Sequence, residues 1–146
     1  AAAFVQASAV GWASSEEIDE IGIIRALGLA AVRAIADLRA HGIVPEEALV
    51  ILDGNHDYIS PAGESGLRVR PIVKADRDCA SAAAASVIAK VARDTVMTGL
   101  HDDLPAYGWE RNKGYASLDH RDAIREHGMS RHHRHSWAIA AAPTLF

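Results

Sequence analysis

The chain has 146 residues, 49% of them hydrophobic, and a formal net charge of −4. This length is that of one domain or most of one. No apolar run approaches the roughly eighteen residues of a membrane span, and no signal peptide opens the chain, so we expect neither a membrane protein nor an exported one. The single cysteine, Cys79, cannot form an internal disulfide. We therefore expect a reducing, cytoplasmic compartment.

Charge is spread unevenly along the chain. Residues 1–66 hold 3 basic and 10 acidic side chains, whereas residues 67–146 hold 12 basic and 9 acidic side chains and 6 of the 8 histidines. A polyanion such as a nucleic acid would be steered toward the second half. An ordinary solvated surface is the alternative, and charge alone does not decide between them.

The first predicted elements are a strand and a long helix. Residues 5–13, VQASAVGWA, suit a strand, and Ser14 with Glu17 forms a capping-box pattern for a short helix. Apolar residues recur at helical spacing through residues 23–41 and predict an amphipathic helix that ends at His41-Gly42. Its apolar stripe is expected in the core and consists of Ile24, Leu27, Ala31, Ala34, Ile35 and Leu38.

Two further strands are predicted, each followed by an aspartate. Residues 48–52, ALVIL, read as a strand buried on both faces that ends at Asp53. The polar segment 56–66 should be an exposed connection. Residues 67–75, LRVRPIVKA, then return to the sheet and lead to Asp76. The alternation of strands and helix predicts a parallel crossover that brings Asp53 and Asp76 to nearby points.

Asp53 and Asp76 carry the main chemical hypothesis. Carboxylates at adjacent strand ends supply hard oxygen ligands to Mg²⁺ or Mn²⁺, the arrangement that metal-assisted phosphodiester hydrolysis requires. A turn-capping role is the alternative, since Asp is common where strands end.

An alanine-rich helix follows Asp76. Alanines 80 and 82–85 would allow it to lie close to the sheet, while Val87, Ile88 and Val91 are expected to fill the core. Lys90 on this helix is a candidate phosphate contact, and a solvated or ion-paired role is the alternative.

Residues 107–120, YGWERNKGYASLDH, form a glycine-bracketed loop before a helix that should start at Ser117 and stop at Gly128. Tyr115 and Lys113 would present an aromatic plane beside a positive charge, which suits stacking with phosphate contact. A structural tyrosine is the alternative. His132, His133 and His135 have poor spacing for a zinc site. His120 reads as a hydrogen-bonded residue at a helix start rather than a general base.

Four motifs in order resemble the bacterial ribonuclease HII family. They are ILDGN, KADRDCASAAAASVIAKVARD, YGWERNKGY and HHRHS, and the resemblance extends from about Ala9 to Trp137. It implies a ribonuclease H-like mixed sheet flanked by helices. It also implies two-metal hydrolysis of RNA in RNA–DNA hybrids and at single ribonucleotides in duplex DNA, with Asp53 and Asp76 as ligands. The family pattern places a ligand in KAD and not at Asp94, and it packs Tyr115 against the sugar at the ribo–deoxyribo junction.

The family's GxDExGRG segment, which carries two more carboxylates, does not occur in this sequence. We therefore expect residues 1–137 to be an incomplete catalytic domain without its first strands, with residues 138–146 as a tail, and we expect a monomer. A second hypothesis follows. With two of four carboxylates, the chain would be a catalytically silent fragment that binds nucleic acid or a partner.

Overall fold

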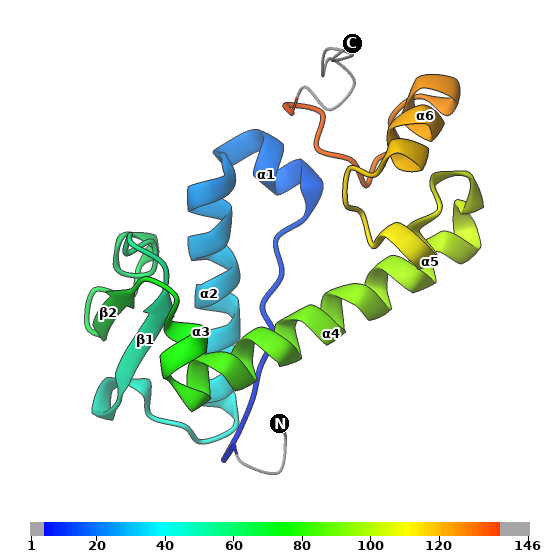
Figure 1. Cartoon of the computed structure of the whole chain (residues 1–146). Coiled ribbons are helices and arrows are strands. Elements are labelled where there is room, and N and C mark those ends of the chain that lie inside the picture. Colours follow the sequence, from blue (N-terminus) through cyan, green and yellow to red (C-terminus); the bar gives the residue numbers. More distant parts are fainter. Residues whose placement is uncertain (1–4, 138–146) are drawn as a thin grey trace. The chain divides into compact units, whose positions relative to one another are not determined.

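The computed structural model describes residues 5–137, and the expected tail 138–146 lies outside them. The chain divides into two compact units, residues 1–90 and 91–146, each described by itself below. Helix α4 (Ala80–Asp103) begins in the first and ends in the second. A small parallel sheet with helices beside it gives the mixed α/β class that the sequence predicts (Figure 1).

Residues 5–14, predicted mainly as a strand, form no regular element, so that prediction was wrong. A strand needs a partner edge for its backbone groups, whereas this segment lies against helix α2 (Ile23–Ala40). A Cβ at Gly11 would sit 1.8 Å from the carbonyl oxygen of Ala30, so only glycine allows this approach. Packing against a helix thus replaces sheet pairing.

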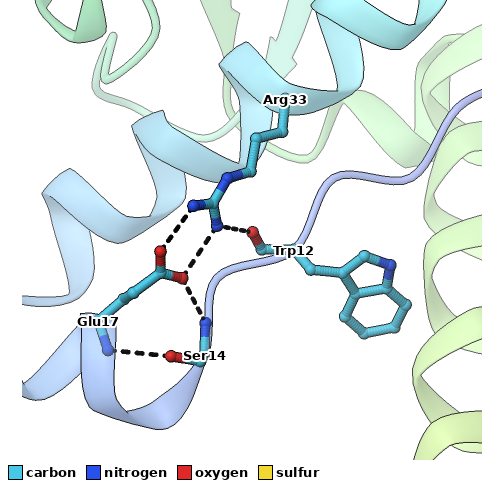
Figure 2. A network of polar contacts seen from close by, with 4 residues as sticks. All are labelled: Trp12, Ser14, Glu17 and Arg33. Carbon is cyan, nitrogen blue, oxygen red and sulfur yellow. Dashed lines mark hydrogen bonds and ion pairs between the residues drawn. The ribbon is translucent and has the colours of Figure 1, made fainter.

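A polar network fastens the same segment to α2 (Figure 2). The predicted capping box is confirmed: the Ser14 hydroxyl accepts from the Glu17 backbone N–H at the start of helix α1 (Ser15–Ile21), and Glu17 accepts from the Ser14 N–H. Arg33 donates to both carboxylate oxygens of Glu17, at 2.6 and 2.9 Å, and to the Trp12 carbonyl. The Arg33 hydrogen bond lowers the pKa of Glu17 to about 2.

Helix α2 matches its predicted bounds, but its buried face differs from the predicted stripe. Ala26, Gly28 and Ile35 are buried, whereas Ile24 is 49% and Leu27 39% exposed. Gly28 sets this orientation, because a Cβ there would lie 2.5 Å from the Tyr58 carbonyl oxygen. The helix therefore turns its smallest side chain, not its largest ones, toward the neighbouring loop.

Strands β1 (Leu49–Asp53) and β2 (Arg68–Ile72) pair in parallel, as predicted, with Asp53 opposite Ile72. The prediction that the first strand is buried on both faces was wrong, since Leu49 is 50% exposed. In the described chain, the covered face of the sheet packs on α2. The core there consists of Ile35, Leu52, Ile59 and Leu67, with Ala31, Val50, Tyr58 and Val69 against it.

The connection between the strands is largely exposed, as predicted, but it is anchored at two buried residues. Ile59 and Glu64 are buried. Asp57 accepts hydrogen bonds from the backbone of Ile59 and from Ser60 at the start of a 3₁₀ turn, and Arg39 of α2 donates to both oxygens of Glu64 at 2.7 Å. A polar sequence here therefore encodes fixed hydrogen bonds as well as solvation.

A short helix, α3 (Ala75–Asp78), separates β2 from α4. Val87 and Val91 on α4 are 53% and 58% exposed, so the prediction that they fill the core was wrong. Neither hydrophobic cluster of the described residues includes them. No helix among residues 5–137 is long and apolar enough to span a membrane.

The second unit has its own core. Tyr107 and Trp109 stack at 5.0 Å between ring centroids and pack with Ala123 and Ile124. Trp109 belongs to helix α5 (Trp109–Asn112). Helix α6 (Leu118–His127) has Ser117 at its N-cap and Gly128 at its C-cap, as predicted.

Candidate active site

The first candidate element is an acidic pair, Asp53 and Asp76, in the first unit. Asp53 ends β1, and its Oδ1 accepts a hydrogen bond of 2.8 Å from the backbone N–H of Ala75. Ala75 is fully buried and opens α3, in which Asp76 is the next residue. The structure thus brings the two predicted carboxylates to the same end of the parallel strands.

The backbone between β2 and α3 bends sharply to allow this contact. Lys74 has φ 59°, a left-handed conformation that non-glycine residues seldom adopt. The Gly54 N–H donates to the Ile72 carbonyl at 3.0 Å and closes the strand pair beyond Asp53. A strained residue two positions before a functional candidate fits the tendency of backbone strain to occur at functional sites.

Apart from the hydrogen bond between Asp53 and Ala75, the carboxylates of the acidic pair have no partner among the described residues. Both residues are exposed, and Asp76 makes no hydrogen bond or ion pair with any residue that the structure describes. Free carboxylate oxygens are the ligands that Mg²⁺ and Mn²⁺ prefer, so the pair fits such an ion chemically. Within residues 5–137, no group of three or more His, Cys, Asp or Glu side chains gathers around a common point. By itself the pair would therefore be only a partial ligand set for such an ion.

The second candidate element is the Tyr115 loop, residues 112–116 of the second unit. The Tyr115 side chain is 62% exposed, and the guanidinium of Arg93 lies over its ring at 4.5 Å from the centroid. Arg93 also donates to the Lys113 carbonyl at 2.6 Å. The Tyr115 ring is thus exposed to solvent, while a hydrogen bond from Arg93 holds the backbone of its loop.

Lys113, predicted to contact phosphate, braces this loop. Its φ is 49°, and its ammonium donates to the Thr98 hydroxyl at 2.7 Å and to the Glu110 carbonyl. Lys90, the other predicted phosphate contact, lies exposed on α4 in the first unit. Asp94 lies in the middle of α4, as predicted.

Sequence reasoning missed Asn112, which organises the loop. Its side chain donates to the Tyr107 carbonyl at 2.7 Å and accepts from the Gly114 N–H at 2.8 Å, while its carbonyl accepts from the Tyr115 N–H. The signal was present in the NKG triplet, because Asn and Gly together mark tight turns. Gly114 is required here, with φ 79° and Met97 3.0 Å from where a Cβ would stand.

Two buried histidines lie under the loop. His120 and His133 are 4% and 5% exposed, and their Nε2 atoms are 3.1 Å apart. The predicted role of His120 as a hydrogen-bonded residue at a helix start is confirmed, because its Nδ1 bonds to the Tyr115 carbonyl at 2.9 Å. Burial lowers the pKa of His133 to about 4, with the neighbouring His120 as the next cause. Nothing in the sequence pattern marked these two residues as a pair.

A pocket of about 470 Å³ opens beside Tyr115. Besides the Tyr115 and Arg93 pair, Arg134 lies over the Trp137 ring at 4.4 Å, and His132 and the two buried histidines also line the pocket. Aromatic planes with adjoining cations are the surfaces on which nucleic-acid bases and sugars stack.

Known proteins match this chain closely. The sequence profile of the ribonuclease HII family matches residues 2–140. The ribonuclease HII of Streptomyces coelicolor is 46% identical over 139 residues, covering 95% of this chain and 56% of that protein. Those of Roseobacter denitrificans and Nitrosomonas europaea are 44% and 41% identical, covering 88% and 91% of this chain and 60% and 57% of those proteins.

The mixed α/β fold and these matches define the class of the protein. The chain belongs to the ribonuclease HII family, as its motifs predicted. It spans a little over half the length of the curated relatives that it matches.

Proposed function

We propose that the protein carrying this chain is an endonuclease. It hydrolyses the RNA strand of RNA–DNA hybrids and cuts at single ribonucleotides in duplex DNA, in the cytoplasm and as a monomer. The observation that carries the proposal is the contact of the Asp53 carboxylate with the Ala75 N–H, which sets Asp53 beside Asp76 at the strand ends. Membership of the ribonuclease HII family supports it.

Asp53 and Asp76 would hold Mn²⁺ or Mg²⁺. When bound, two such ions activate water and stabilise the leaving 3′-oxygen of the phosphodiester. Asp53 keeps one oxygen on the Ala75 N–H, which fixes the direction of its other oxygen. Asp76 follows the backbone turn at Lys74, whose φ is positive. The protein itself supplies no nucleophile in this scheme, and residues 1–137 would form its ribonuclease H-like part.

Tyr115 would read the junction between ribose and deoxyribose. A ring packed on a sugar accepts a bare C2′, whereas a 2′-hydroxyl there would be crowded and without a partner. Exposure of the ring and its support by Arg93 favour this role. Lys113 and Lys90 would contact the phosphate backbone, where positive charge supplies much of the affinity for nucleic acids.

Aspartate-to-asparagine substitutions test the metal role. In the full-length protein, Asp53→Asn and Asp76→Asn should each reduce turnover on an RNA–DNA hybrid by about a hundredfold or more, or ~3 kcal/mol in the barrier. Asparagine keeps an acceptor for the Ala75 N–H, so the fold should survive. Asp78→Asn on the same short helix is the matched control and should stay near wild type. Turnover within about threefold of wild type for both variants would contradict the metal role.

A catalytically silent binding fragment is the second candidate. The proposed ligand set has only two carboxylates, and no group of three or more His, Cys, Asp or Glu side chains gathers among residues 5–137, which favours this candidate for the 146-residue chain on its own. Tight binding of an RNA–DNA hybrid without cleavage in Mn²⁺ would support this candidate. Cleavage by a sample whose intact mass equals that of the 146-residue chain would reject it.

A further inference from the structure

The hydrogen bonds of His120 and His133 favour one neutral tautomer of each ring. Ser130 donates its backbone N–H to His133 Nδ1 at 3.0 Å, and its hydroxyl lies 2.9 Å from the same nitrogen. The indole N–H of Trp109 donates to His120 Nε2 at 3.3 Å. The third fixed partner is the Tyr115 carbonyl, which can only accept and lies 2.9 Å from His120 Nδ1. Backbone N–H and indole groups are donors only, so they determine which ring nitrogens carry hydrogen.

The ring hydrogens can be assigned in order, starting at His133 and ending at His120. His133 accepts at Nδ1, so its hydrogen is on Nε2 and is donated to His120 Nε2. His120 accepts at Nε2 from both His133 and Trp109, so its hydrogen is on Nδ1 and is donated to the Tyr115 carbonyl. Each donor then faces an acceptor, with the His133 and Trp109 donors sharing the one lone pair of His120 Nε2. The opposite tautomers would place donor against donor at the Ser130 and Trp109 N–H groups and acceptor against acceptor at the Tyr115 carbonyl.

Protonation of either ring breaks the arrangement. A hydrogen on His133 Nδ1 would oppose the Ser130 N–H and would have only the Ser130 hydroxyl, at 2.9 Å, to accept it. A hydrogen on His120 Nε2 would face the Trp109 N–H. The lowered pKa of His133, caused first by burial, agrees with this geometry. The arginines and histidines around the pair are cationic or can become so, which opposes protonation further: Arg93, His132, Arg134 and His135. Among the described residues, the other titratable side chains against the pair are the phenols of Tyr107 and Tyr115.

We infer that His133 and His120 form a neutral relay that positions Tyr115 by fixing its backbone carbonyl, and so sets the ring for reading the substrate. The inference rests on the proposed function of Tyr115. The Ser117 N–H donates to the same carbonyl at 2.8 Å, so two donors fix it on the α6 side. Asn112 and Arg93 hold the other side of the loop.

The relay acts on specificity and not on the chemical step. The carbonyl and the ring belong to one residue, so freeing the carbonyl lets the whole residue rotate about its backbone. Stacking depends on the placement of the ring, and a displacement of about 1 Å is enough to lose much of such a contact. His120 and His133 are therefore positioning residues that act through Tyr115.

Ring-nitrogen NMR tests the relay directly. Long-range ¹H–¹⁵N correlation spectra of the chain at pH 7 should show His120 protonated on Nδ1 and His133 protonated on Nε2. Exposed His127 on α6 serves as the internal reference for a solvated ring. A hydrogen on His120 Nε2, or a cationic form of either ring at this pH, would overturn the inference.

Cleavage ratios test its consequence. In the full-length protein, the rate on a single embedded ribonucleotide is divided by the rate on a continuous hybrid, so any loss of folded enzyme cancels. His120→Ala should lower this ratio about fivefold, whereas His120→Asn, which keeps a donor near the Nδ1 position, and the control His127→Ala should stay within about twofold. In a Tyr115→Ala background, His120→Ala should lower the ratio no further, because both changes remove the same contact of the Tyr115 ring with the substrate sugar.

The outcomes separate the two proposals. If Tyr115→Ala lowers the ratio and His120→Ala leaves it at the wild-type value, the relay is overturned and the reading by Tyr115 stands. If Tyr115→Ala itself leaves the ratio unchanged, the proposed reading by Tyr115 fails and the relay's role in specificity fails with it.

Discussion

The acidic pair and the Tyr115 loop differ in how their polar groups are satisfied. Asp53 makes one hydrogen bond and Asp76 makes none within the described residues. Around Tyr115, by contrast, Arg93, Asn112 and His120 each bond to the backbone of the loop. The acidic pair keeps carboxylate oxygens without a partner among the described residues, whereas several side chains hold the backbone of the Tyr115 loop.

This difference matches the two tasks that we propose. A metal ligand must keep lone pairs available for the ion, and a carboxylate in water does so at little energetic cost. A ring that reads a sugar must stand in one place before the substrate arrives, which requires a rigid support. The two strained lysines, Lys74 and Lys113, mark both regions as places where the backbone is held against its preference.

Within the Tyr115 loop, the largest expected effect on activity concerns the ring of Tyr115. Tyr115→Ala should slow cleavage of a single embedded ribonucleotide by ~1–3 kcal/mol in the barrier, with a much smaller loss on a continuous hybrid. Tyr115→Phe should retain most activity, because the hydroxyl makes no hydrogen bond with any residue in 5–137. Steady-state rates on the two substrates decide the matter. Equal losses on both substrates, or a Phe variant as poor as the Ala variant, would make Tyr115 a scaffold residue.

The buried histidines should make the second unit sensitive to acid. The pKa of His133 is lowered to about 4 in the folded chain, so the unfolded chain takes up this proton near pH 6.5 and the folded chain only near pH 4. The contribution of His133 to the free energy of unfolding should therefore be complete above pH 6.5 and should fall by about 2–3 kcal/mol between pH 6.5 and 4.

Denaturant unfolding of wild type and His133→Gln at several pH values measures this effect. Because glutamine does not titrate, the difference between the two proteins should shrink as the pH falls, while the carboxylates cancel. A difference that stays constant between pH 7.5 and 4.5 would show that His133 is not held neutral.

Asp94 offers a smaller effect that probes the choice of ligands. Asp94→Asn should lower the free energy of unfolding by about 1 kcal/mol, through a changed contact at its partly buried carboxylate, and should retain metal-dependent cleavage. Thermal unfolding and an Mn²⁺ titration of activity measure the two properties separately. A metal-binding defect in Asp94→Asn with normal binding in Asp76→Asn would move the acidic site to α4.

The smallest effect lies outside both regions. Ser14→Ala removes the N-cap of α1 and should lower stability by roughly 0.5–1 kcal/mol. Since the capping box belongs to neither the acidic pair nor the Tyr115 loop, rates on both substrates should stay at wild-type values. A selective loss on one substrate would show that the N-terminal segment contributes to substrate reading.

Local signals in the sequence predicted the elements well. The Ser14 capping box, helix α2, the Ser117 cap and the parallel pairing of the strands were all found from short patterns. The meeting of Asp53 with the start of α3 followed from that pairing. Each depends on residues close in sequence or on a general rule of chain topology.

The predictions that failed concerned features that depend on contacts between residues far apart in the sequence. Periodicity identified the apolar faces of α2 and α4, but the exposure of Leu27 and Val87 depends on what packs against them. Residues 5–13 have strand-like composition, yet Gly11 packs on α2. The pairing of His120 with His133 joins residues thirteen apart through a fold of the chain that no spacing rule describes.

Manganese-induced NMR line broadening tests the central claim most directly, because it finds the ion without requiring turnover. Mn²⁺ titrated into the ¹⁵N-labelled chain should broaden the amide signals of residues 53–55 and 74–78 first. Asp53→Asn should abolish this broadening, whereas Asp78→Asn should preserve it. Broadening that begins at the histidines of residues 132–135, or that persists unchanged in Asp53→Asn, would contradict the assignment of Asp53 and Asp76 as the metal ligands.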